Sequence, residues 1–107
     1  MIYHIAEERH WREARSAGEY RMSTRGRTLA EEGFIHCSDA SQVHGVARRF
    51  YADLSDLVLL TIDPARLRSE LRHEAAPGSD ERFPHVYGPL NVDAVVHVEA
   101  FDPNRAS

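Results

Sequence analysis

Apolar residues recur at helical spacing in two segments of the chain, and each segment carries signals that begin or end a helix. The first helix is predicted over residues 6–17 and ends before Gly18, a residue that readily takes the left-handed conformation at a helix end. The second is predicted from Ala40, because Asp39 is a favourable N-cap and Gln42 stands three residues later, as in a capping box. Its apolar positions define one stripe: Val43, Val46, Ala47 and Phe50.

Three other segments have the patterns of strands. Residues 57–63 form a continuous apolar run, which is typical of a strand buried on both faces. Residues 92–101 alternate as a half-buried strand does, and residues 2–5 predict a strand near the start of the chain. The apolar side of the last strand would consist of Val96, Val98 and Ala100. Shorter predicted elements are a strand at residues 20–24, a helical turn at residues 28–32, a short helix from Asp63-Pro64 and an exposed loop at residues 75–82.

These elements do not alternate regularly enough to build a doubly wound parallel sheet. The chain has 107 residues, which suffices for one ordinary domain with one packed core. We therefore predict a compact α+β domain over residues 1–101, with a mixed or antiparallel split sheet and two or three helices. Residues 102–107 are predicted to form a mobile tail.

The sequence GFIHCS, residues 33–38, places polar groups on an apolar strand. Because side chains alternate along a strand, Phe34, His36 and Ser38 share one face, and Ile35 and Cys37 share the other. The second face is typical of a core. The first is either the floor of a pocket or an exposed sheet face.

The sequence FPHVYGPL, residues 83–90, repeats this pattern with Phe83, His85 and Tyr87 on one face. If the two strands are neighbours, the polar groups of both strands converge on one site: His36, Ser38, His85 and Tyr87. Tyrosine stacks on planar rings, and histidine and serine bond hydroxyls or phosphates. The alternative is that Phe83 and Tyr87 are ordinary core aromatics followed by a Gly-Pro turn.

Two more histidines lie on predicted strands, and one acidic residue precedes the second motif. His4 stands among apolar neighbours, whereas His97 shares its face with Glu99 and is expected to face solvent. Glu74 comes before the loop that leads to the second motif, so it is the best candidate acid at a cleft edge. A surface role for Glu74 is the alternative.

Charge and composition limit the classes of partner. The chain is 42% hydrophobic and 28% charged, with a net charge of −4, and it lacks the basic stripe that a long nucleic-acid footprint needs. Arg21, Arg25 and Arg27 form a small cluster that would suit one or two phosphates. The predicted helix start after Ser38 is a second candidate anion site, although the Asp39 carboxylate would repel an anion there.

The single cysteine limits the possible thiol chemistry, and the length of the apolar runs limits the possible membrane contacts. Cys37 cannot form an intrachain disulfide, and its core-facing position without an adjacent base argues against a thiol nucleophile. The longest apolar run is far shorter than the ~20 residues of a membrane span. Nor does the start of the chain have the pattern of a signal peptide. We therefore expect a cytoplasmic protein with no membrane partner.

Three motifs in this order, GFIHCS, LVLLTID and FPHVYGPL, resemble a bacterial family known as domain of unknown function 952. The resemblance extends from Ile2 to about Val98. A more distant resemblance concerns residues 36–38, the helix that follows and the strand that ends at Asp63. This block is similar to one in the tRNA 2′-phosphotransferases, which belong to the ADP-ribosyltransferase-like superfamily.

The second resemblance implies an ADP-ribosyltransferase-like fold with NAD or an ADP-ribose-related nucleotide in a cleft between two small sheets. It implies that His4 contacts ribose hydroxyls, that His36 and Ser38 hold ribose or phosphate, and that Tyr87 stacks on a ring. His85 would complete the binding site. In an enzyme acting at the ribose, Glu74 would stabilise positive charge at the anomeric carbon, and His36 would be the second catalytic residue.

Two further hypotheses stay open. A non-catalytic module for ligand sensing or protein interaction would need no catalytic glutamate. A zinc site built from His4, His36 and His85 is chemically reasonable, because three imidazoles plus water suit catalytic zinc, but no short ligand spacing supports it. The nucleotide hypothesis needs no metal. The oligomeric state is left open.

Overall fold

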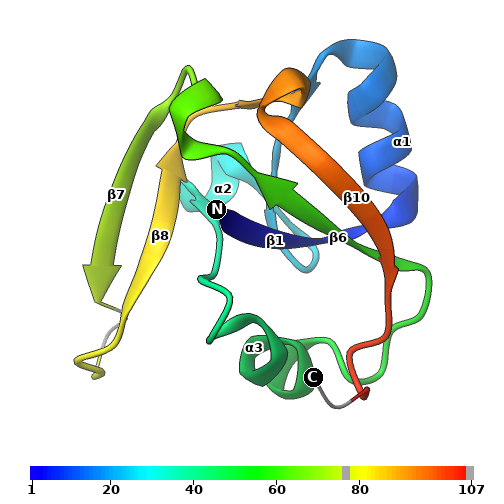
Figure 1. Ribbon diagram of the computed structural model, residues 1–107, viewed down its shortest axis with the longest axis vertical. Helices are drawn as coiled ribbons and strands as arrows, with labels where there is room; N and C mark the ends of the chain where they lie inside the picture. Colours follow the sequence, from blue (N-terminus) through cyan, green and yellow to red (C-terminus); the bar gives the residue numbers. More distant parts are fainter. Residues whose placement is uncertain (76–77, 106–107) are drawn as a thin grey trace.

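A three-stranded antiparallel sheet forms the centre of the molecule, and its middle strand is the predicted apolar run. The computed structural model describes residues 1–75 and 78–105. In it β6 (Leu57–Ile62) lies between β1 (Ile2–Glu7) and β10 (Val95–Phe101), as Figure 1 shows. Five of the six β6 residues are buried, so this strand has both faces covered, as its continuous apolar sequence predicts.

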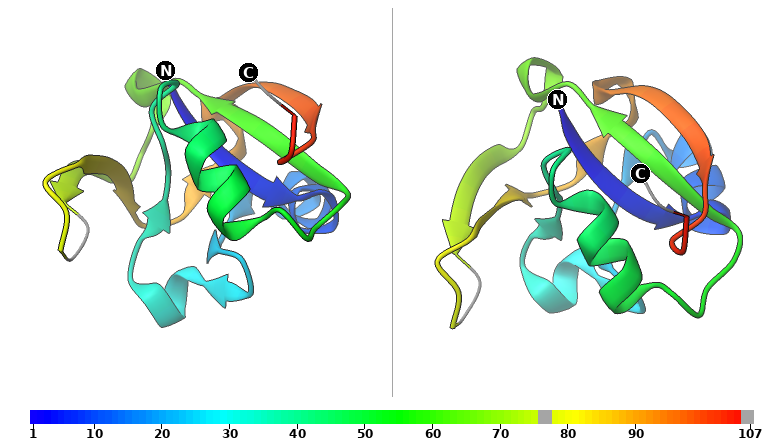
Figure 2. Two further views of the ribbon diagram at one scale, coloured as in Figure 1. Left: turned by 90° about the horizontal axis from the view of Figure 1, so that it is seen from below. Right: turned by 60° about the horizontal axis from the view of Figure 1, so that its bottom comes forward.

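Two helices cover the two faces of this sheet. Helix α1 (Glu8–Ala17) packs Trp11 and Ala14 into the cluster that contains Leu60 and Ile62 of β6. Helix α3 (Val43–Phe50) covers the other face (Figure 2). It packs Val43 and Ala47 with the alternate β6 residues Leu57 and Leu59. The alternation of side chains along β6 thus supplies two separate cores from one strand.

A second antiparallel sheet carries both motifs singled out in the sequence. Its order is β5 (Ile35–His36), β8 (Arg82–Tyr87) and β7 (Glu70–Ala75). The β7–β8 hairpin extends to one side, away from α1 (Figures 1 and 2). Part of the predicted loop at residues 75–82 lies outside the described residues, at positions 76 and 77.

Short elements connect the two sheets. Paired backbone hydrogen bonds between Tyr3 and Ser38, each 2.8 Å, tie the central sheet to the chain just after β5. Thr28 caps α2 (Leu29–Glu32) with a complete capping box, and Gly18 and Gly33 end α1 and α2 in the left-handed conformation. The remaining short elements are β2 (Glu19–Tyr20), β3 (Met22–Thr24), β4 (Arg27–Thr28), α2 (Leu29–Glu32), β9 (Leu90–Asn91), and two 3-10 turns, η1 (Pro64–Arg66) and η2 (Val92–Ala94). The result is one α+β domain with antiparallel sheets and few helices.

The start of α3 differs from the sequence prediction. The helix begins at Val43 rather than Ala40, because residues 40–42 form a turn. Gln42 does accept the Asp39 backbone N–H at 2.9 Å, but its amide also donates to the carbonyl of Arg82 at 2.7 Å. Gln42 therefore ties α3 to β8, and the predicted anion site at Ala40 is not formed by a helix end.

The last strand differs in its burial. Residues 92–94 form η2, so β10 begins only at Val95. Its predicted apolar side is exposed, with Val96 at 44% and Val98 at 38%, because β10 is an edge strand and these side chains lie outside the cluster that α1 covers. After β10 the chain turns, and the Asn104 amide donates to the Ala52 carbonyl. Residues 106–107 of the predicted mobile tail lie outside the described residues. Within the described chain, no helix is both long and apolar enough to cross a membrane.

Gly88, in the turn after β8, is the glycine whose replacement we expect to cost most. Its φ is +149°, and an added Cβ would lie 2.5 Å from Oγ of Ser69. That hydroxyl donates to the Pro89 carbonyl, so its displacement breaks a tertiary hydrogen bond. We expect Gly88→Ala to lower the free energy of unfolding by about 1–3 kcal/mol in urea denaturation.

Gly45 provides the matched control for this substitution. It lies in α3 with nothing within 4 Å of an added Cβ, so Gly45→Ala should be neutral or stabilising by up to about 1 kcal/mol. Equal effects of the two substitutions would contradict the assigned strain at Gly88.

Candidate functional site

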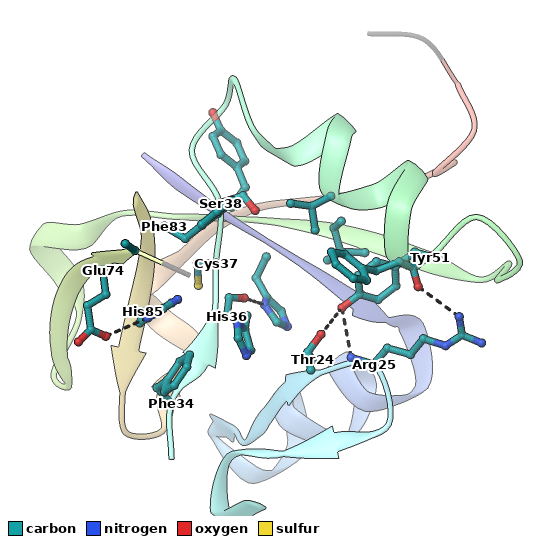
Figure 3. Close-up of a pocket in the computed structure, with 16 residues that line it drawn as sticks. Thr24, Arg25, Phe34, His36, Cys37, Ser38, Tyr51, Glu74, Phe83 and His85 are labelled. Atoms are coloured by element: carbon teal, nitrogen blue, oxygen red, sulfur yellow. Dashed lines mark hydrogen bonds and ion pairs between the residues drawn. The ribbon is translucent and has the colours of Figure 1, made fainter. Parts of the chain in front are cut away.

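A cavity of about 680 Å³ opens between the two sheets and α3 (Figure 3). Its floor is formed by β1 and the chain from β5 to Ser38, and its walls by the β7–β8 hairpin and α3. Most of its lining is apolar. We call the end formed by Phe34, His36, Phe83 and His85 the aromatic end, and the end formed by Thr24, Arg25, Phe50 and Tyr51 the α3 end.

The two sequence motifs meet at the aromatic end, as their shared pattern predicts if the strands are neighbours. His36 is the direct partner of His85 in the antiparallel register of β5 and β8, so the two side chains lie on one face. Their ring centroids are 5.4 Å apart. Phe34 stacks on the His85 ring at 4.1 Å, which holds the imidazole in one orientation.

Glu74 joins this cluster from β7, where it lies opposite Phe83. Its Oε1 accepts hydrogen bonds from the Tyr87 hydroxyl at 2.5 Å and from Nδ1 of His85 at 2.9 Å. These two bonds, the Tyr87 bond first, hold the pKa of Glu74 below its usual value, so the side chain is a carboxylate at neutral pH. Glu74 lines the cavity, as expected for an acid at a cleft edge.

Tyr87 lies beside the cavity and is not one of its lining residues. Its hydroxyl is directed to Glu74, and the Arg72 guanidinium lies over its ring at 4.4 Å. The bond to Glu74 raises the pKa of Tyr87. The ring expected to stack on a ligand is thus occupied by Arg72, and at this end of the cavity the rings of Phe34 and Phe83 line it instead.

His4 touches the cavity but has both ring nitrogens engaged inside the protein. It is 2% exposed. Nδ1 lies 2.5 Å from the His36 carbonyl, which can only accept, so Nδ1 carries the proton. Nε2 therefore accepts from the Tyr20 hydroxyl at 2.9 Å. Burial lowers the pKa of His4 to about 4, so the ring is neutral and structural, with no nitrogen left for ribose hydroxyls.

The same hydrogen bonds remove the basis of the three-histidine zinc hypothesis. A zinc ligand needs an imidazole nitrogen with a free lone pair, and His4 has none. Among residues 1–75 and 78–105, no three His, Cys, Asp or Glu side chains are placed to hold a metal ion.

The remaining predicted site residues lie on the cavity floor. His36 is half-buried, and burial lowers its pKa although its Nε2 lies 3.2 Å from a Glu32 carboxylate oxygen. Ser38 lines the cavity, and its hydroxyl has no hydrogen-bond partner in the described part of the chain.

Burial raises the pKa of Cys37 to about 12, so its thiol stays protonated, in agreement with the argument against a nucleophile.

Apart from Arg25, the residues of the α3 end were not indicated as a site by the sequence. The Tyr51 hydroxyl lies 3.0 Å from Oγ1 of Thr24 and accepts the Arg25 backbone N–H. The Arg25 guanidinium binds both carboxylate oxygens of Asp53, at 2.5 and 2.7 Å. Phe50 is 55% exposed at this end.

The predicted arginine cluster is divided among separate partners. Arg25 binds Asp53, whereas Arg21 lies 3.1 Å from Glu19 and Arg27 lies 2.8 Å from Glu32. Each guanidinium is already paired with a carboxylate, so the three do not form one shared anion site. Arg25 alone reaches the cavity.

Comparisons with known proteins place the chain in a family. A family model described as "Protein of unknown function (DUF952)" matches residues 5–98, and the chain belongs to this family. The chain is similar to the X-ray crystal structure of protein CC0527 from Caulobacter crescentus, with a TM-score of 0.82 and 32% sequence identity over 94% of this chain and 85% of that one. The solution NMR structure of CC0527 gives a TM-score of 0.78 at 32% identity, over 94% of this chain and 84% of that one. No curated protein matches the chain.

Proposed function

We propose that the protein binds NAD or an ADP-ribose-related nucleotide in the cavity between its two sheets. The observation that carries this proposal is the cavity itself, about 680 Å³, with aromatic rings and hydrogen-bonding side chains gathered at one end. This volume falls within the range of small-molecule sites, roughly 300–1,000 Å³. The resemblance of residues 36–38 and the following segments to the ADP-ribosyltransferase-like superfamily supports the choice of ligand class.

The charges around the cavity suggest how such a ligand would lie. Glu74 places a negative charge at the aromatic end, and Arg25 is the arginine among the described lining residues, at the α3 end. A phosphate group would therefore lie toward Arg25, and an uncharged or cationic ring toward Phe34 and Phe83. Arg25 would have to exchange part of its bidentate bond with Asp53 for the phosphate.

Ser38, between the two ends, and His36, at the aromatic end, would hold the ribose. The Ser38 hydroxyl is available for a ligand hydroxyl, and His36 lies beside it on the same cavity floor. His4 supports this floor through its bond to the His36 carbonyl and makes no ligand contact of its own.

Isothermal titration calorimetry with NAD and with ADP-ribose tests the proposal. We expect saturable binding to the wild type and a loss of about tenfold in affinity for His36→Ala, the usual effect of removing one hydrogen-bonding side chain. His97→Ala is the matched control, because His97 is 61% exposed on β10 and takes no part in the cavity. Absence of saturable binding by both nucleotides would refute the proposed function.

A further inference from the structure

The hydrogen bonds of His85 fix which of its ring nitrogens is free. Glu74 is ionised and can only accept, so the 2.9 Å contact requires the proton of the neutral ring on Nδ1. Tyr87 donates to the same carboxylate oxygen and helps to hold Glu74 in place. With Nδ1 protonated, Nε2 of the neutral ring carries a free lone pair.

That lone pair is open to the cavity. Nε2 of His85 has no hydrogen-bond partner among the described residues. In that part of the chain, every fully buried side-chain nitrogen or oxygen atom does have a partner. Nε2 is therefore accessible, although His85 as a whole is only 7% exposed. Figure 3 shows the ring extending from Glu74 toward the interior of the cavity.

We propose that His85 is the general base of this site and that Glu74 is the positioning residue that holds its reactive tautomer. The proposal rests on the proposed nucleotide function and adds a reaction to it, hydrolysis of NAD at the nicotinamide ribose. A carboxylate bonded to one imidazole nitrogen while the other faces a substrate is the arrangement that activates water or a hydroxyl in many enzymes.

The reaction balances without a further reactant. A water O–H bond breaks as its proton passes to Nε2 of His85, and the water oxygen forms a bond to the anomeric carbon. The C–N bond to nicotinamide breaks, and its electron pair leaves with the ring, which departs as neutral nicotinamide. The imidazolium then releases its proton to solvent, so NAD and water give ADP-ribose, nicotinamide and one proton.

Other basic or nucleophilic groups in the cavity are less suited to this step. Both nitrogens of His4 are occupied, and the Cys37 thiol is protonated, with its pKa raised to about 12. The pKa of His36 is lowered by burial, which makes it a weaker base, and its Nε2 already faces Glu32.

The test is nicotinamide release from NAD between pH 5 and 9, measured beside NAD affinity by calorimetry. In His85→Asn the side-chain amide can replace Nδ1 as donor to Glu74, while Nε2 is removed. We expect release to fall at least about 100-fold, since general bases contribute roughly 10²–10⁴-fold, with NAD affinity within about threefold of the wild type.

Glu74→Gln tests the positioning role through the tautomer of His85. We expect slower release with little change in NAD affinity, and nitrogen NMR that shows part of the neutral His85 ring with its proton on Nε2, because an amide at position 74 can donate to Nδ1 as well as accept from it. The other charged or titratable groups around His85 are Arg72 opposite it on β7, His36 on β5 and Tyr87 on β8. Glu70→Gln is the control: Glu70 is on the same strand and face but pairs with Arg72.

Three outcomes would overturn the inference. NAD binding without nicotinamide release would leave a non-catalytic ligand-sensing module, with the proposed binding function intact. Unchanged release in His85→Asn would remove His85 as the base. Nitrogen NMR of the wild type showing the proton of neutral His85 on Nε2 would contradict the tautomer. Failure to bind NAD at all would instead refute the proposed function and with it this reaction.

Discussion

His4→Ala is expected to lower the free energy of unfolding by about 3–5 kcal/mol. The substitution removes a fully enclosed ring and leaves the Tyr20 hydroxyl, itself on a 2% exposed residue, without an acceptor. It also removes the donor to the His36 carbonyl. Burying a polar group without a partner costs about 1–3 kcal/mol, and the cavity left by the side chain adds to this.

Urea denaturation followed by circular dichroism measures this loss. His97→Ala is the control, with an expected change within about 0.5 kcal/mol, because His97 is exposed on an edge strand. Tyr20→Phe should recover part of the loss when combined with His4→Ala, since it removes the unpaired hydroxyl. A loss below about 1 kcal/mol for His4→Ala would contradict the structural role assigned to this histidine.

The sequence predicted the faces of the site strands better than the roles of the single residues on them. Alternation alone placed His36 and His85 on the cavity side and Ile35 and Cys37 in the core, because the side-chain period of a strand is fixed. The contact between the two strands depends on sheet order, which the local pattern does not contain. The predicted convergence of the two motifs therefore depended on the strands being neighbours, and the structure places His36 opposite His85.

The roles of His4 and Tyr87 could not be predicted, because they depend on partners far along the chain. His4 is neutral because it is buried, and it is structural because its ring nitrogens bond Tyr20, 16 residues away, and a carbonyl 32 residues away. Tyr87 is directed to Glu74 and covered by Arg72, both from the neighbouring strand β7. A histidine or tyrosine on the correct face can thus bond the protein rather than a ligand.

The same distinction between local and distant causes applies to the fold. The burial of β6 on both faces follows from its own residues, whereas the exposure of β10 follows from its place at the sheet edge. The start of α3 was displaced to Val43, where Gln42 bonds both Asp39 and the distant Arg82. Local signals therefore predicted most of the longer elements but not β7, and tertiary contacts decided the ends and surroundings of the elements.

Stability is expected to fall by about 3 kcal/mol as the pH decreases from 6.5 to 4, because of His4 alone. Burial lowers the pKa of this histidine from 6.5 to about 4 in the folded protein. In that interval the unfolded chain binds a proton at His4 and the folded protein does not, so acid favours unfolding. Well above pH 6.5 both states are neutral at this residue, and its contribution no longer changes with pH.

Urea denaturation at pH 7, 6 and 5 separates His4 from the other groups. Carboxylates with lowered pKa values, such as Glu74 and Asp53, add their own loss only as the pH falls toward their unfolded-state values, near 4. His36 also has a lowered pKa, so His36→Gln shows its share of the slope. His4→Asn, which retains a donor toward the His36 carbonyl, should flatten the dependence by about 1 kcal/mol per pH unit below pH 6. An equal slope in His4→Asn and wild type, or an NMR titration of His4 near its unperturbed pKa, would show that the ring is not held neutral by burial.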